Sequence, residues 1–184
     1  GHPLVLLVMG ALTSFILGIG MTVTAAYIFL AIILAPALIK LGLDPLSVHM
    51  FLLYWGMLSF ITPPVALAAF AAASVAKCGP MRCGFEAMRI GAIIYFIPFF
   101  FVLNPALLGQ AGAGEILIVL ISALAGITLL AAALQGHLIA LGTLGAGVPG
   151  LLARLLLAAA GLTLAAPGGA MIGLSHTELA FAAA

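Results

Sequence analysis

The chain has 184 residues, of which 66% are hydrophobic and only 5% charged, and its mean hydropathy is +1.45. So few polar side chains cannot coat a water-soluble globule, and the composition therefore predicts an integral membrane protein. The formal net charge of +1 gives no support for nucleic-acid binding or for a polybasic membrane-surface domain. Because the first residue is Gly and no basic segment precedes the apolar run, we expect a piece of a longer polypeptide.

The first predicted element is a pair of short apolar segments joined by a glycine-rich tip. Residues 4–17 form the first segment, and residues 25–41 form the second, with a kink at Pro36. The tip at residues 18–24 contains two glycines, which permit backbone conformations closed to other residues. Because both segments are short, we favour a re-entrant hairpin that enters and leaves the membrane on one side. Two full spans are the alternative.

The next predicted element is a helix broken inside an apolar run. Its halves are residues 48–61 and 65–76, and Thr62, Pro63 and Pro64 lie between them. Two adjacent prolines cannot continue a helix, and lipid offers no water to the carbonyls that they leave free. In transporters such breaks commonly line the cavity that holds the substrate or the coupling ion. The sequence therefore predicts a binding site at this break.

A polar loop at residues 77–89 follows, with a short surface helix expected from Phe85. It holds three of the five Lys and Arg residues, so the positive-inside bias predicts that it is cytoplasmic. The loop at residues 41–48 is then external. Further membrane segments are predicted at residues 90–108, through Pro98, at 115–134 and, more weakly, at 151–166. We therefore divide the chain into a core, residues 1–110, and additional membrane helices, residues 111–184.

The ends of these predicted helices suggest what the break binds. The carbonyls of residues 58–61 lose their donors and carry the negative end of the helix dipole, which favours a cation. The hydroxyls of Ser59 and Thr62 add neutral oxygens suited to a hard monovalent cation. The helices that begin after Thr24 and near Val65 present free N–H groups, which favour an anion. A carboxylate could bridge these two helix starts.

Several segments resemble one transporter family. They are Gly18-Ile19-Gly20-Met21-Thr22-Val23-Thr24-Ala25-Ala26-Tyr27, Ala35-Pro36-Ala37-Leu38, Leu58-Ser59-Phe60-Ile61-Thr62-Pro63-Pro64-Val65-Ala66-Leu67-Ala68-Ala69, Phe96-Ile97-Pro98-Phe99 and Asn104-Pro105-Ala106-Leu107-Leu108. Together they are similar to the large membrane subunit of tripartite ATP-independent periplasmic (TRAP) transporters, and more narrowly to its fused-permease branch. The resemblance covers roughly residues 10–110 and extends only loosely to the tail.

The resemblance implies an all-α permease of elevator type, built from two inverted halves that each carry a re-entrant hairpin and a discontinuous helix. This chain looks like the carboxyl-terminal half, so the partners implied are the missing N-terminal half and a periplasmic substrate-binding protein. The implied function is ion-gradient-driven uptake of a small carboxylate, a small organic anion, across the bacterial inner membrane. The protein is then multi-pass in the lipid bilayer, with Na+ as the coupling ion and no other cofactor. The family usually has proline where this chain has Thr22, and threonine where it has Val23.

We accordingly expect two overlapping sets of site residues. The substrate-binding residues are Gly18, Gly20, Thr22, Thr24, Thr62, Pro63 and Pro64. The cation-binding residues are Ser59, Thr62 and Gly20. We further expect Gly20 to be the point where the hairpin tip approaches the broken helix.

Two other function classes are weighed against transport. A non-transporting membrane scaffold would use the broken helix only to pack against a partner. An intramembrane hydrolase would need Ser59 and His49 to meet and an oxyanion hole to form, and no nucleophile-elbow glycine pattern supports it, so no enzyme is expected. Cys78 and Cys83 are expected to be reduced, and the scattered histidines form no metal-binding motif.

Overall fold

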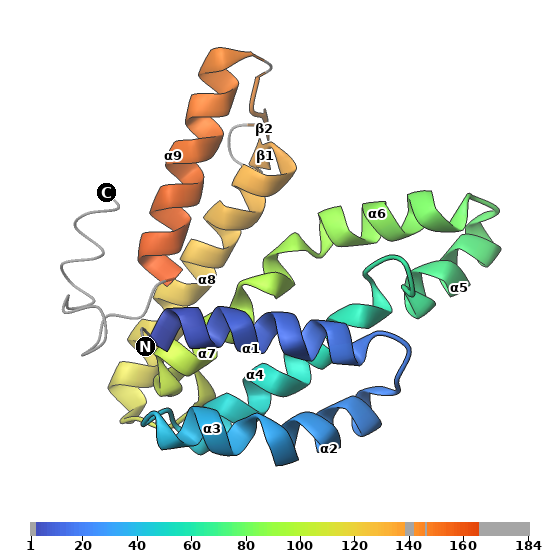
Figure 1. Cartoon of the computed structure of the whole chain (residues 1–184). Helices are drawn as coiled ribbons and strands as arrows, with labels where there is room; N and C mark the ends of the chain where they lie inside the picture. The colour runs from blue at the N-terminus through green and yellow to red at the C-terminus, as the bar shows by residue number, and fades with distance from the viewer. Residues whose placement is uncertain (1–2, 139–141, 146, 166–184) are drawn as a thin grey trace. The chain divides into compact units, whose positions relative to one another are not determined.

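The computed structural model describes residues 3–138, 142–145 and 147–165, and helices dominate this part of the chain (Figure 1). The chain divides into two units, Gly1–Val102 and Leu103–Ala184. The first unit contains α1 (Pro3–Gly18), α2 (Val23–Ile33), α3 (Ala35–Lys40), α4 (Pro45–Met57), the 3-10 helix η1 (Leu58–Phe60), α5 (Leu67–Ala76), α6 (Pro80–Ile90), the 3-10 helix η2 (Ala92–Tyr95) and most of α7 (Ile97–Leu103). The second unit contains the 3-10 helix η3 (Pro105–Leu108), α8 (Ala113–Gln135), the short strands β1 (His137–Leu138) and β2 (Gly142–Thr143), and α9 (Val148–Ala165).

The core of the first unit lies where α1, α2 and α3 pack against α4. Leu7, Leu30 and Phe51 are almost completely buried there. The outer faces of the same helices are also apolar, and Ile16 and Ile32 are 63% and 70% exposed. A helix that is hydrophobic all round needs either a large protein core or a membrane around it. The packing therefore agrees with the composition in placing this unit in a bilayer.

The predicted hairpin tip is present, and local hydrogen bonds shape it. α1 ends at Gly18, Gly20 has a positive φ of 81°, and α2 begins at Val23. Thr22 caps α2, since its side-chain oxygen accepts a hydrogen bond from the Ala25 N–H at 3.3 Å. The second arm breaks between α2 and α3 at Leu34, close to the kink predicted at Pro36.

The broken helix is also present, with a later restart than the sequence predicted. α4 ends at Met57 and continues as η1, which ends at Phe60, and residues 61–66 form a turn. α5 begins at Leu67 rather than at Val65, because neither proline can donate a helical hydrogen bond and Ala66 adopts a left-handed conformation with φ of 35°.

Two predictions for the following segment are wrong in detail. α6 begins at Pro80, not at Phe85, because proline is favoured in the first turn of a helix. The segment at residues 90–108 is not one continuous helix, since it consists of η2, α7 and η3. Pro98 and Pro105 lack N–H donors, and they lie in the first turns of α7 and η3 respectively. Together, α6 and the segment Ala92–Leu103 bend by 67°.

The second unit is a hairpin of α8 and α9, which lie side by side (Figure 1). Its close approach depends on Gly126 and Gly161: a Cβ atom built at Gly126 would lie 2.6 Å from the Gly161 carbonyl oxygen. Arg154 of α9 donates to the carbonyls of Ala133 and Leu134, at 2.7 and 2.9 Å, where α8 would otherwise leave acceptors free. The antiparallel pair β1 and β2 was not predicted.

Within residues 3–138, 142–145 and 147–165, two helices are long and apolar enough to cross a membrane, Ala113–Gln135 and Val148–Ala165. A third candidate arises there if the bent pair from Pro80 to Leu103 counts as one span. The two long helices correspond to the segments predicted at residues 115–134 and 151–166. The arms of the hairpin, Leu4–Gly18 and Val23–Ile33, are shorter apolar helices.

Candidate functional site

The candidate site is the break between α4 and α5, where two carbonyls lack helical donors. In a continuous helix, the carbonyls of Ser59 and Phe60 would accept from residues 63 and 64. Both of those residues are prolines, which have no N–H to donate. The Leu58 carbonyl is satisfied, since it accepts from the Thr62 N–H at 3.1 Å. The break thus leaves two backbone oxygens without helical donors at the negative end of the α4 dipole.

Thr62 is buried at the centre of this break, and its hydroxyl makes two contacts. It donates to the Leu58 carbonyl at 2.7 Å, and it also lies within hydrogen-bond distance of the Tyr95 hydroxyl. A threonine hydroxyl has one hydrogen, so Tyr95 donates to Thr62 when Thr62 donates to Leu58. A further lone pair of the Thr62 oxygen remains as a possible ligand for a cation.

Ser59 is buried next to the break as well. Its hydroxyl donates to the Gly56 carbonyl at 3.0 Å, so its oxygen also keeps acceptor capacity. The structure therefore brings Ser59 and Thr62, the two side chains predicted as cation ligands, to the same end of the broken helix.

The start of the hairpin tip packs against the last turn of α4. A Cβ atom at Gly18 would lie 2.9 Å from the Gly56 carbonyl oxygen, so only glycine allows this approach. Gly56 is in turn the acceptor for Ser59. The prediction that Gly20 makes the close approach is wrong, because nothing lies within 4 Å of a Cβ built there. Gly20 supplies the positive φ of the turn, and Gly18 supplies the contact.

The remaining predicted residues lie around this contact without joining it. Thr22 and Thr24 are exposed on the tip, and Thr22 is used as the cap of α2. Pro63 is half-buried and Pro64 is exposed. Gly18 and Ser59 thus meet at the Gly56 carbonyl, and Thr62 contacts Leu58 and Tyr95 at the break, whereas the threonines of the tip lie outside these contacts.

Two glycines of the next segment let it approach the break. A Cβ at Gly84 of α6 would lie 2.8 Å from Cγ of Pro63, and one at Gly91 would lie 3.0 Å from Cδ1 of Ile61. Because a proline ring cannot move aside easily, Gly84 fixes which face of α6 meets the break.

An aromatic wall surrounds the break. Trp55 contacts Phe15 of α1, Tyr95 and Phe99, with ring centroids 6.4, 6.1 and 5.9 Å apart. Its indole Nε1 is buried and has no hydrogen-bond partner within the part of the chain that the structure describes. Sequence reasoning missed Tyr95, whose signal was a hydroxyl within an otherwise apolar, charge-free stretch.

The geometry does not assemble a hydrolase. His49 pairs through Nδ1 with the Tyr27 hydroxyl at 3.0 Å, whereas Ser59 bonds to Gly56. Ten residues of helix separate Ser59 from His49, a rise of roughly 15 Å. Among residues 3–138, 142–145 and 147–165 no cluster of potential metal ligands occurs. Cys78 and Cys83 are free thiols, and two of the scattered histidines, His2 and His176, lie outside the described residues.

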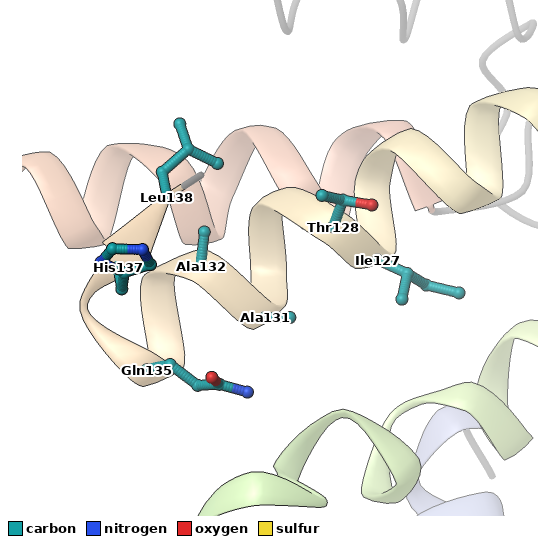
Figure 2. A pocket seen from close by; sticks show the side chains of 7 residues that line it. All are labelled: Ile127, Thr128, Ala131, Ala132, Gln135, His137 and Leu138. Atoms are coloured by element: carbon teal, nitrogen blue, oxygen red, sulfur yellow. The ribbon is translucent and has the colours of Figure 1, made fainter. Parts of the chain in front are cut away.

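A separate pocket of about 300 Å³ lies in the second unit, along the end of α8 and the start of β1 (Figure 2). Its polar side chains are Thr128, Gln135 and His137. The Thr128 hydroxyl donates to the Leu124 carbonyl of its own helix at 2.7 Å. None of these residues belongs to the predicted site.

Residues 1–116 match the sequence model of a family described as tripartite ATP-independent periplasmic transporter, DctM component. The chain belongs to this family. No curated protein and no solved structure matches the chain. The matched residues include the hairpin tip, the break and Tyr95, whereas α9 and nearly all of α8 lie beyond them.

Membership in the DctM family confirms the predicted TRAP permease resemblance. The chain is therefore a permease component associated with a membrane and with a periplasmic binding protein. The family is one of transporters and not an enzyme class, and its membership does not favour the scaffold alternative.

Proposed function

We propose that the first unit of this DctM chain forms one half of the transport site for a small carboxylate, with Na+ as the coupling ion. The observation that supports this most directly is the contact between Gly18 and Gly56. Gly56 lies about one helical turn before the break, so this contact places the start of the hairpin tip close to the break. A tip and a break that meet in this way can enclose a solute between two helix ends.

The cation is proposed to bind at the carboxyl end of α4. Its ligands would be the free backbone carbonyls of Ser59 and Phe60 together with the side-chain oxygens of Ser59 and Thr62. All are neutral oxygens, which suit a hard monovalent ion, and the helix dipole adds negative potential there. No Asp or Glu lies between Pro45 and Ala76, so this part of the chain supplies no carboxylate proton relay.

The carboxylate is proposed to bind at the amino ends of α2 and α5. Thr22 satisfies the Ala25 N–H but leaves the first N–H groups of α2 without a helical partner. α5 has no side-chain cap at Ala66, so its first N–H groups are likewise without one. No Lys or Arg lies between Pro45 and Ala76, and backbone N–H groups are therefore the proposed anion donors.

The remaining elements of the proposal concern the complete transporter. α1 and α2 are shorter than the roughly 20 residues that a span needs, which supports a re-entrant hairpin. We propose that a missing N-terminal half supplies the inverted counterpart of this unit and that the two work as an elevator. The complete protein would then be a multi-pass permease of the bacterial inner membrane.

The experiment uses the complete permease, with its other half and its binding protein, in proteoliposomes. Uptake should follow an imposed Na+ gradient, and Thr62→Val should raise the Na+ concentration for half-maximal uptake on the order of tenfold, which corresponds to about 1.4 kcal/mol of lost ligand interaction. Thr62→Ser keeps the oxygen and should restore much of the affinity.

Thr128→Val is the matched control, because its hydroxyl also donates to a carbonyl four residues earlier at 2.7 Å but lies in α8. It should leave the Na+ dependence unchanged. Equal uptake from a pH gradient without Na+ would refute Na+ coupling. An unchanged Na+ dependence in Thr62→Val would remove the hydroxyl from the cation site.

A further inference from the structure

We propose that α6, together with Lys77, forms a binding site for the phosphate of an anionic lipid at the membrane surface. This site lies apart from the transport site and does not depend on the proposed solute or coupling ion. Three observations support this site: a charged surface cavity, the separation of apolar and charged side chains on the exposed face of α6, and the bend that follows α6.

The cavity has a volume of about 510 Å³ and is lined by residues 77–79, 82, 83 and 86. This size lies within the roughly 300–1,000 Å³ of small-molecule pockets, so it can hold a phosphate with part of its glycerol. Lys77 and Arg82 both line it, and both are exposed. A lysine and an arginine on one cavity match the charge of a phosphate.

The only carboxylate on this cavity is already neutralised. Glu86 forms an ion pair with Arg89, with hydrogen bonds of 2.6 and 3.1 Å. Within the described ranges, neither Lys77 nor Arg82 lies at salt-bridge distance from a carboxylate. The cavity therefore presents net positive charge, and three cations stand against one anion from Lys77 to Arg89.

The exposed face of α6 is apolar along one side and charged along the other. Met81 and Phe85, four residues apart, are 47% and 58% exposed. Arg82 and Glu86 are also four residues apart and exposed beside them. The opposite face is fixed inward, because Gly84 packs against Pro63. A helix with this division lies in the interface plane, with its apolar side chains among acyl chains and its cations among headgroups.

The bend at Gly91 is what allows this placement. The segment that follows, Ala92–Leu103, is apolar and can enter the bilayer. Because the chain bends by 67° between α6 and this segment, α6 can lie along the membrane surface while the segment enters the bilayer. The charged residues of α6 can then stay at headgroup level, where basic residues attract anionic lipid. The positive-inside bias of this loop favours the cytoplasmic leaflet.

The test uses the purified complete transporter in detergent, titrated with short-chain phosphatidylglycerol and, separately, phosphatidylcholine. The readout is the lipid concentration that gives half-maximal thermal stabilisation. Phosphatidylglycerol should act at the lower concentration. Lys77→Gln and Arg82→Gln should each raise that concentration about fivefold, from the typical contribution of one basic residue near an anionic surface. Arg82→Lys should retain most of the effect.

Lys40→Gln is the matched control, because Lys40 is an exposed cation at the end of α3 and lies outside the cavity. It should leave the phosphatidylglycerol concentration unchanged. Equal stabilisation by both lipids, or the same shift in Lys40→Gln, would overturn the proposal. Stabilisation by glycerol phosphate alone at the same concentration would also overturn it, because the site would then recognise a soluble phosphate and not a lipid. Transport is not part of the readout, so failure here leaves the transport proposal intact.

Discussion

The contact between the hairpin and the broken helix can be tested by adding one methyl group, with Gly18→Ala. The new Cβ would lie 2.9 Å from the Gly56 carbonyl oxygen, whereas ordinary contacts begin at 3.4 Å. The obstacle is backbone and cannot rotate aside, so the hairpin tip must move by about half an ångström or more. Overpacking of this kind costs about 1–3 kcal/mol. Replacing a helical glycine by alanine stabilises the helix by up to about 1 kcal/mol, which offsets part of this cost.

The net change in the free energy of unfolding is therefore modest, about 0–3 kcal/mol destabilising. Transport should be impaired as well, because the displaced tip no longer meets the break in the binding geometry. We expect the substrate concentration for half-maximal uptake to rise on the order of tenfold, equivalent to about 1.4 kcal/mol. The assay is Na+-driven uptake by the complete permease in proteoliposomes, with thermal stability measured in parallel.

Gly10→Ala provides the control on the same helix. A Cβ at Gly10 would meet Cδ2 of Leu34 at 3.5 Å, which is ordinary contact, so this variant should be as stable as the parent or more stable. Its uptake should be unchanged. If Gly18→Ala behaved like Gly10→Ala in both stability and uptake, the contact with Gly56 would have no part in positioning the tip.

Two further predictions concern side-chain and helix contacts. Tyr95→Phe removes the hydroxyl that donates to Thr62, so it should lower the free energy of unfolding by about 1 kcal/mol. It should also lower the Na+ concentration for half-maximal uptake, because a lone pair of the Thr62 oxygen becomes free to bind the cation. Tyr54→Phe, whose ring contacts Phe101, should leave the Na+ dependence unchanged. Gly126→Leu should force α8 and α9 apart and lower the thermal midpoint, because even its Cβ would lie 2.5 Å from the Ala165 nitrogen. Gly114→Leu is the control: nothing lies within 4 Å of a Cβ there, so this variant should leave the thermal midpoint unchanged. Equal midpoints for the two leucine variants would show that the close packing is unnecessary.

The sequence was most informative where the chemistry of the backbone is local. Pro63 and Pro64 remove helical donors wherever they occur, so the break could be placed from the sequence alone. Gly20 likewise specifies a turn through its own conformational preferences, and α2 begins at Val23, two residues before the predicted start at residue 25. Each of these features depends on a few consecutive residues, and the structure places each of them close to its predicted position.

The sequence was least informative where two distant segments meet. Gly18 and Gly20 look equivalent in a glycine-rich tip, and only the packing of α1 on α4 shows which one makes the close approach. Tyr95 reaches Thr62 across 33 residues, and no periodicity of the apolar stretch could indicate that pair. The start of α6 at Pro80 was missed because the charged residues suggested a loop, although proline is common in the first turn of a helix.

Close packing at three glycines explains how so apolar a chain can form a polar site. Gly18 approaches the last turn of α4 and Gly84 approaches Pro63 at distances that a Cβ atom would prevent, and Gly91 approaches Ile61 at a distance where a Cβ atom would fit only tightly. The missing Cβ atoms let backbone and hydroxyl groups gather at the break without any charged residue, which a membrane would penalise. The helix that ends at Phe60 and the helix that begins at Leu67 flank this break, and their ends carry partial charges of opposite sign. Because these charges belong to the backbone, they are kept by the packing of the three glycines rather than by the identity of any single polar side chain.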